Sequence, residues 1–176
     1  MGFLRDAAFD EVDDPFEESL IELANAVPEQ LDVQTLHSLY TVKRSPQGEG
    51  DARVNVAWVE PVKKMADLNR RWQRTFAVVK PEMTWFNGNV DNLIEALPEA
   101  QEFLQKHPQA WFSAEVLDDV LMTAYALCDD ESPAPVLDAA QRLADHAVAV
   151  LQSLAGDAQL HWAVQAHRPL LRCLAI

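Results

Sequence analysis

The sequence predicts an all-α protein, either an antiparallel helical bundle or a short helical-repeat array of about six to eight helices. Composition is the first indication: five of the 176 residues are glycine, whereas the good helix formers alanine, leucine, glutamate and glutamine are common. Spacing is the second, because apolar residues recur three and four positions apart in segment after segment. With 49% apolar residues, the chain can bury a sizeable core within one domain.

The helical spacing is clearest over residues 61–79. With a turn of about 100° per residue, one set of apolar side chains falls in a narrow stripe and a set of basic side chains falls on the opposite side. Pro61 fits the first helical position, where its missing N–H costs nothing. We therefore expect a helix with one core face and one cationic face. The apolar stripe consists of Met65, Leu68, Trp72, Phe76 and Val79, and the cationic face consists of Lys63, Lys64, Arg70, Arg71 and Arg74.

Residues 1–44 are interpreted as an acidic N-terminal helical hairpin. Asp14 and Pro15 suit the cap and the first residue of one helix. Asp32 can cap a second helix that extends to about Lys43. The apolar face of this second helix would consist of Val33, Leu36, Leu39 and Tyr40.

Residues 45–51 are the only loop-rich stretch, and they separate this hairpin from a main helical domain over 52–176. The two parts are expected to form one compact unit. Over 53–59, apolar and more polar residues alternate, which is typical of a strand. No second segment pairs convincingly with it, however, and a lone strand leaves its backbone groups without hydrogen bonds. We therefore interpret residues 52–59 as an added helical turn or an extended link, with a short strand as the alternative.

Further helices are expected in the main domain. One runs from Val90 to Leu97, and Pro98 either kinks it or starts a new helix that reaches Lys106. Ser113 can cap the next helix, because its hydroxyl can accept a hydrogen bond from a backbone N–H of the first turn.

The longest helix is expected from about Pro135 to Ala155, and Gly156 should end it in a left-handed conformation. A last helix is expected from Ala158. The residues expected to be buried in the two helices after Ser113 are Val116, Leu117, Val120, Leu121, Ala124, Leu127, Leu137, Ala140, Leu143, Ala144, Ala147, Leu151 and Leu154.

The net charge of −14 is unevenly distributed along the chain. Residues 1–42 carry a net charge of −9, residues 43–80 of +5 and residues 81–176 of −10. Such a balance disfavours nonspecific DNA binding by the whole molecule, because phosphate contacts need a positive surface. The central basic segment can still bind an anion locally. Alternatively, it neutralises the chain's own acidic arms or is simply solvated.

Nothing in the sequence predicts a membrane span or a cysteine-based metal site. Cys128 and Cys173 are far apart and neither belongs to a Cys-x-x-Cys pair, so we expect two free thiols. The first residues lack the basic and apolar regions of a signal peptide, and no run of about 18 apolar residues is present. We therefore expect a cytoplasmic protein.

An acidic pattern introduces a possible enzyme. Glu99-x-x-Glu102 is followed, after twelve residues, by Glu115-x-x-Asp118. Carboxylates three apart lie one turn apart on a helix, so two such turns on facing helices can hold Mg²⁺ or Mn²⁺ through four oxygens. This spacing, together with the Asp119-Val120-Leu121 that follows, resembles the all-α nucleoside triphosphate pyrophosphatases of the MazG type over about 35 residues. The resemblance implies that Glu99, Glu102, Glu115 and Asp118 bind magnesium and that the reaction is hydrolysis of a nucleotide at the α–β phosphate bond.

Aromatic residues in the turns between helices are further candidates for binding. Trp85 and Trp111 either plug the ends of the helical assembly or form a recognition patch, since tryptophan and arginine are favoured at binding hot spots. The candidate binding residues are Lys63, Lys64, Arg70, Arg71, Arg74, Trp85 and Trp111.

The function we expect is that of a non-enzymatic acidic helical protein that binds another macromolecule, and the expected partner is a protein rather than a nucleic acid. It would serve as an adaptor subunit or as an antitoxin- or immunity-type inhibitor steered by charge. This expectation rests on the segregated charge, the aromatic turns and the lack of a phosphate-binding loop, dinucleotide fingerprint or nucleophile elbow. No cofactor is expected. The alternatives are the magnesium-dependent hydrolysis implied by the resemblance and nucleic-acid binding through the basic helix over 61–79.

Overall fold

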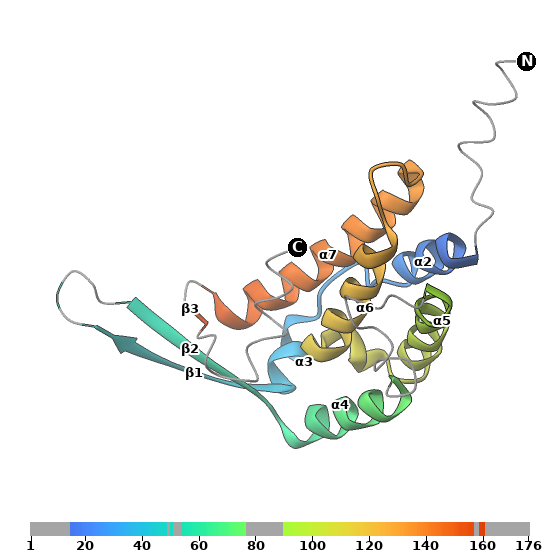
Figure 1. Ribbon diagram of the computed structural model, residues 1–176. Coiled ribbons are helices and arrows are strands. Elements are labelled where there is room, and N and C mark those ends of the chain that lie inside the picture. Colours follow the sequence, from blue (N-terminus) through green and yellow to red (C-terminus); the bar gives the residue numbers. More distant parts are fainter. Residues whose placement is uncertain (1–14, 49, 51–53, 77–89, 157–158, 161–176) are drawn as a thin grey trace, which may run out of the picture.

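The computed structural model describes residues 15–48, 50, 54–76, 90–156 and 159–160, which form a mainly helical protein with a small β-sheet (Figure 1). The mainly helical prediction is therefore confirmed. None of the described helices is long and apolar enough to cross a membrane. The described helices are α2 (Pro15–Asn25), α3 (Val33–Ser38), α4 (Lys63–Phe76), α5 (Val90–Lys106), the 3₁₀ helix η3 (Pro108–Phe112), α6 (Ala114–Leu127) and α7 (Ala134–Ala155). The described strands are β1 (Tyr40–Gln47), β2 (Val54–Pro61) and β3 (Gln159–Leu160).

Four helices enclose most of the hydrophobic core. Helix α2 packs against α7, α7 against α6, α6 against α5, and α5 against α2, so their contacts close a ring. The long helix α7 buries Leu143, Val150 and Leu154 completely. Helix α4 packs on the outside of this ring, against α5, α6 and β2, and lies at the bottom of Figure 1. In these contacts the helical neighbours of α4 lie on one side of it, and its other side is available to solvent.

The structure corrects the prediction for the segment between α3 and α4. Helix α3 ends at Ser38, and the chain continues as β1, which pairs antiparallel with β2 over its full length. The two strands form a hairpin that extends away from the helices (Figure 1). The helix predicted to reach Lys43 is therefore wrong, and so, over its described residues 54–59, is the interpretation of 52–59 as a helical turn or link. The strand kept as the alternative over 53–59 is present from Val54 on, and residue 53 lies outside the described residues.

The error has a physical origin in the five residues after α3. Leu39 and Tyr40 are both buried, as they would be on one face of a continuing helix. Thr41 and Lys43 are exposed while Val42 is half-buried, which is the alternation of a strand. The β-branched side chains of Thr41 and Val42 also favour strand. The two strands satisfy each other's backbone, which removes the objection to a lone strand.

The end of α7 is joined to this hairpin. Gly156 ends the helix with φ 57° and ψ −131°, so the predicted positive φ is confirmed but the conformation is not that of a left-handed helix. Arg44 of β1 donates to a carbonyl oxygen in the last turn of α7 at 3.5 Å, which places a positive charge at the negative end of the helix. Residues 159–160 then pair parallel with β2. The predicted helix from Ala158 is therefore wrong at these two residues, and its continuation lies outside the described part.

Two proline predictions are resolved by the structure. Helix α5 is continuous with Pro98 inside it, so no new helix starts at Pro98. Pro61 is the last residue of β2, and α4 starts at Lys63 rather than at the proline. The predicted cap of α3 is confirmed, because Asp32 Oδ1 accepts a hydrogen bond from a backbone N–H of the first turn at 3.1 Å. Of the segment predicted over 61–79, the part after α4 lies outside the described residues.

Two residues predicted to be buried are exposed. Val33 is 47% exposed at the first position of α3, and Leu137 is 39% exposed on α7. On α7 the inward position belongs to Val136, which is in helical register with Leu143. The side chains of Val79 and Leu127 lie outside the described part. The predicted core residues that are confirmed are Leu36, Leu39, Tyr40, Met65, Leu68, Trp72, Phe76, Val116, Leu117, Val120, Leu121, Ala124, Ala140, Leu143, Ala144, Ala147, Leu151 and Leu154.

Candidate binding groove beside helix α4

The apolar stripe of α4 fixes the orientation of the helix. Trp72 is fully buried, and its ring stacks on Phe76 with the centroids 4.6 Å apart. The same ring meets the edge of Phe103 on α5 at 5.2 Å. Its indole Nε1 donates a hydrogen bond to Asp119 Oδ2 on α6 at 2.8 Å. The hydrogen bond to α6 and the ring contact with α5 together fix the rotation of α4 about its axis. The opposite face of the helix therefore has a fixed orientation toward solvent.

The opposite face of α4 is cationic, and all five of its predicted basic residues are exposed: Lys63, Lys64, Arg70, Arg71 and Arg74. Arg70 forms an ion pair with Asp67 on the same helix. The first turn of α4 contains no acidic residue and begins with two lysines. Because the N-terminus of a helix carries a partial positive charge, lysines there are electrostatically unfavourable. The helix dipole therefore does not stabilise these two charges.

A groove runs between α4 and the junction of α5 with η3. Its volume is about 690 Å³, and we call it the α4 groove. The α4 side contributes residues that lie three or four positions apart and thus form one stripe of the helix. The groove is lined by Lys64, Asp67, Leu68, Arg71, Lys106, His107, Pro108 and Gln109.

A smaller hollow of about 270 Å³ adjoins the α4 groove, since Lys106 and His107 line both. Its α4 side is Thr75, one turn beyond Arg71, and its α5 side includes Glu99 and Glu102. From Lys64 to Thr75 the two hollows follow α4 for roughly 16 Å, given a rise of about 1.5 Å per residue. The result is an elongated depression on the surface.

The charges in this depression are separated along its length. Lys106 Nζ lies 2.7 Å from Glu102 Oε1, and the hydrogen bond and charge of Lys106 lower the pKa of the Glu102 carboxyl. The same pair raises the pKa of Lys106. Within the described part of the chain, Lys64 and Arg71 have no ion-pair partner. Asp67 also lines the first end, where its charge is offset by its ion pair with Arg70. The end beside Lys64 and Arg71 therefore carries a net positive charge, and the end beside Glu99 and Glu102 is negative.

The wall of the groove that η3 provides is anchored from the inside. Tyr40 Oη donates to the Phe112 carbonyl at 2.7 Å and accepts from the Ala114 N–H at 3.1 Å. Ser113 Oγ donates to Asn69 Oδ1 at 2.6 Å. The predicted cap of α6 is confirmed, because the same hydroxyl accepts a hydrogen bond from the backbone N–H of Val116 at 3.2 Å. Side chains from β1 and α4 thus hold η3 against the core.

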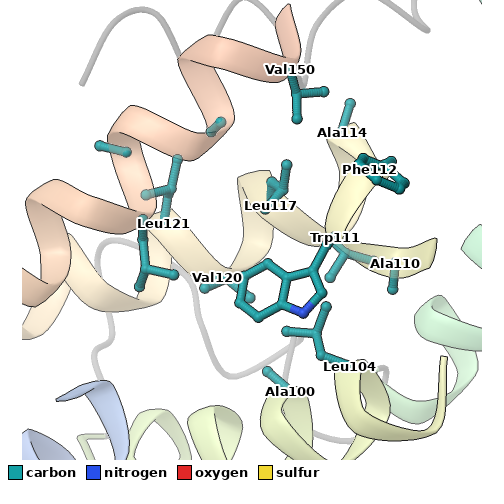
Figure 2. Close-up of a cluster of buried hydrophobic side chains, with 14 of the residues drawn as sticks. Ala100, Leu104, Ala110, Trp111, Phe112, Ala114, Leu117, Val120, Leu121 and Val150 are labelled. Carbon is teal, nitrogen blue, oxygen red and sulfur yellow. The ribbon is translucent and has the colours of Figure 1, made fainter. Parts of the chain in front are cut away.

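Trp111 lies inside the protein and not on a recognition surface. It is 5% exposed and is surrounded by apolar side chains of α5, η3 and α6, including Leu104 and Val120 (Figure 2). Its ring meets the ring of His146 edge-on, with the centroids 5.6 Å apart. Of the two interpretations of this tryptophan, burial supports the plug, and Trp111 drops out of the candidate binding residues. Trp85 lies outside the described residues.

His146 of α7 completes this junction. Its Nε2 lies 2.7 Å from the Trp111 carbonyl oxygen. Because a carbonyl only accepts, Nε2 is the nitrogen that carries the proton. Burial lowers the pKa of His146, and the bond to the carbonyl opposes this shift only partly. The ring is therefore held neutral as a structural donor.

The four carboxylates implicated by the resemblance do not come together. Glu99 and Glu102 are exposed on α5, whereas Asp118 is 3% exposed on α6. Glu115 accepts a hydrogen bond from Gln73 of α4 at 2.7 Å. Within the described residues, no three or more His, Cys, Asp or Glu side chains form a group that could hold a metal ion. The magnesium site implied by the spacing is therefore not formed by these residues here.

Cys128 offers no activated thiol. It is half-buried, and burial together with the nearby charge of Asp129 raises the pKa of its thiol, which disfavours the nucleophilic thiolate. It is a free cysteine, as predicted. Cys173 lies outside the described residues.

Sequence reasoning found Lys64 and Arg71 but missed the opposite wall of the groove. Lys106, His107 and Gln109 come from a distant segment, and tertiary contacts such as the packing of Trp72 on Phe103 and the hydrogen bond between Ser113 and Asn69 bring them beside α4. The available signal was a lysine in the last turn of α5 followed by His107-Pro108.

Comparison with known proteins gives no match to a protein-family model, to a curated protein or to a solved structure. Fold and groove therefore define a mainly helical protein with a local cationic site in an acidic chain.

Proposed function

We propose that this protein is a non-enzymatic binding protein that docks onto another protein through the cationic face of α4. One observation carries the proposal. All five basic side chains of this face are exposed on a single helix, in a chain whose net charge is −14. Their only ion pair within the described residues is the one between Arg70 and Asp67 on the same helix.

The placement of the lysines at the start of α4 supports a role in binding rather than in stabilising the fold. Lys63 and Lys64 oppose the helix dipole, and a surface charge in such a position costs about 0.3–1 kcal/mol. Local features that lower stability without a structural return are expected at functional sites. The face is also carried by a helix that Trp72 locks in place, which is how binding residues are best held.

A protein partner is favoured over nucleic acid. A continuous polyanion lying along α4 would pass Glu99 and Glu102 at the far end of the depression, and like charges repel. The net charge of the chain also slows the approach of a nucleic acid. A protein surface can instead offer acidic groups only where α4 needs them.

Of the two roles considered, this surface supports the adaptor subunit. An antitoxin- or immunity-type inhibitor would use the acidic parts of the chain against a basic enzyme. The exposed basic face of α4 would contribute nothing to such a complex. An adaptor instead needs a defined surface of opposite charge to its partner, as this face provides.

The test is affinity capture of the tagged full chain from an extract of its native cells, with washes at low and then high salt. We expect one dominant protein that is released by salt, because contacts between exposed charges are screened. A variant with Lys63, Lys64, Arg70, Arg71 and Arg74 all changed to Gln should not capture it. The control changes Lys43→Gln with Arg142→Gln, two exposed cations outside α4. Capture of the same protein by wild type and by the α4 variant would contradict the proposal.

A further inference from the structure

We propose that the α4 groove receives a short acidic segment of the partner protein, with carboxylates placed on Lys64 and Arg71. This inference rests on the proposed function and specifies how the partner is recognised. The groove divides the basic residues of α4 into two groups. Lys64 and Arg71 line the groove and make the contacts, whereas Lys63, Arg70 and Arg74 lie outside it.

The spacing of the groove cations defines the segment. Lys64 and Arg71 are seven residues apart on α4, which separates them by roughly 10 Å along the helix axis. In an extended chain of polyproline II type, residues three apart point the same way and are separated by about 9 Å. Two carboxylates three residues apart can therefore meet both cations at once. The guanidinium of Arg71 can bind its carboxylate through two parallel hydrogen bonds.

The form of the depression favours a linear segment over a small metabolite. Sites for small molecules usually enclose most of the ligand's surface. Here the lining cations Lys64, Arg71 and Lys106 are all exposed, so a compact ligand would remain largely in water. The apolar side chains of Leu68 and Pro108 also line the groove, where they can contact the carbon atoms of a peptide.

The separation of charge gives the segment a direction. Past Lys106, the depression becomes acidic at Glu99 and Glu102. A segment with its carboxylates at the Lys64 end and neutral or basic residues at the other end fits both ends. A segment that is acidic throughout would be repelled at the second hollow.

The first experiment measures binding of a short fluorescein-labelled serine peptide with two glutamates three residues apart, by fluorescence anisotropy at low ionic strength. The groove variant is Lys64→Gln with Arg71→Gln. The matched control is Lys63→Gln with Arg74→Gln, which has the same residue types on the same helix and the same change in net charge, and which leaves the ion pair between Arg70 and Asp67 intact. We expect the groove variant to lose about fivefold in affinity or more. The control should lose less than about twofold.

The possible results separate this inference from the proposed function. Equal loss in both variants would overturn the groove and leave the cationic face as the docking surface. No loss in either variant, or no binding by the wild type, would overturn both. A single-stranded oligonucleotide that bound as tightly as the peptide would overturn a peptide ligand. Tighter peptide binding after removal of residues 1–14 would assign the groove to this chain's own acidic segment and overturn a partner-derived occupant.

A second variant tests the direction of the segment. Glu99→Gln with Glu102→Gln removes the acidic end and also releases Lys106 from its ion pair. We expect this variant to bind a peptide composed only of glutamates at least about threefold more tightly than the wild type. Its affinity for the serine peptide with two glutamates should change less. Equal changes for the two peptides would overturn the proposed direction. Unchanged circular dichroism spectra in all variants show that folding is retained.

Discussion

Polar groups on the two sides of η3 differ in burial and in bonding. On the inner side, Tyr40, Asn69 and Ser113 are buried and each hydrogen bonds to another buried group. On the outer side, Lys64 and Arg71 are exposed and have no ion-pair partner within the described residues. The inner groups are therefore part of what determines the fold, whereas the outer charges are only tolerated by it. This difference separates residues that stabilise the protein from those we propose to bind.

The expected changes in stability support this separation of stabilising from binding residues. A buried polar group that loses its partner costs about 1–3 kcal/mol, whereas substitutions of exposed side chains away from such groups usually change stability by less than about 0.5 kcal/mol. Variants of the junction should therefore unfold more easily, and variants of the groove should lose binding without unfolding. A variant that did both would show that the two sides are coupled through η3.

The largest effect is expected from Tyr40→Phe. The hydroxyl of Tyr40 donates a hydrogen bond to the Phe112 carbonyl and accepts one from the Ala114 N–H, and both partners are buried. Without it, the free energy of unfolding should fall by about 2–3 kcal/mol, as measured from urea denaturation. The matched control is Tyr125→Phe at the chain's other tyrosine, which is only partly buried and should change stability by less than about 0.5 kcal/mol. Similar losses in both variants would show that the junction is not special.

The same contrast explains what could be predicted from the sequence. The apolar stripe and the cationic face of α4 depend only on spacing within one helix, so both were predicted correctly. The α4 groove depends on Lys106 and His107, which reach α4 only through tertiary packing. Strand β1 was missed because Leu39 and Tyr40, which are adjacent and both buried, extend the helical pattern of α3, and the alternation starts only after them. Its assignment required the pairing partner, β2, which comes later in the chain.

The carboxylate pattern failed for a related reason. Spacing places Glu115 and Asp118 one turn apart on α6, but it does not state which way the helix faces. The structure buries Asp118 and leaves Glu99 and Glu102 in solvent. Trp111 was uncertain in the same way, since an aromatic residue between helices fits a plug and a surface equally. Only its burial distinguishes the two.

An intermediate effect is expected from pH at the junction. Burial lowers the pKa of His146 below the value of about 6.5 for an unfolded histidine. Below pH 6.5 the unfolded chain therefore takes up this proton more readily than the native protein does. The stability contributed by the neutral ring is complete above about pH 6.5 and falls as the pH drops toward the native pKa, by up to about 1.4 kcal/mol per pH unit.

His146→Gln tests this dependence, because the glutamine amide can still donate to the Trp111 carbonyl but does not titrate. Urea midpoints measured above and below about pH 6.5 should fall less in this variant than in the wild type. The control is His37→Gln, an exposed histidine of α3, which should retain the wild-type dependence. If His146→Gln kept the full dependence, other groups would be responsible for it.

The smallest effect is expected on the outer side, where the lysines oppose the dipole of α4. Lys63→Glu should raise the free energy of unfolding by about 0.5–1 kcal/mol at low salt, because a carboxylate suits the N-terminus of a helix. Arg74→Glu, in the last turn of the same helix, should lower it by a similar amount. Thermal midpoints at low and high salt measure both changes, which should shrink as salt screens them. A gain in stability from Lys63→Glu that accompanies weaker capture of the partner would show that α4 keeps its lysines for binding. A loss of stability from Lys63→Glu would mean instead that the lysine supports the fold.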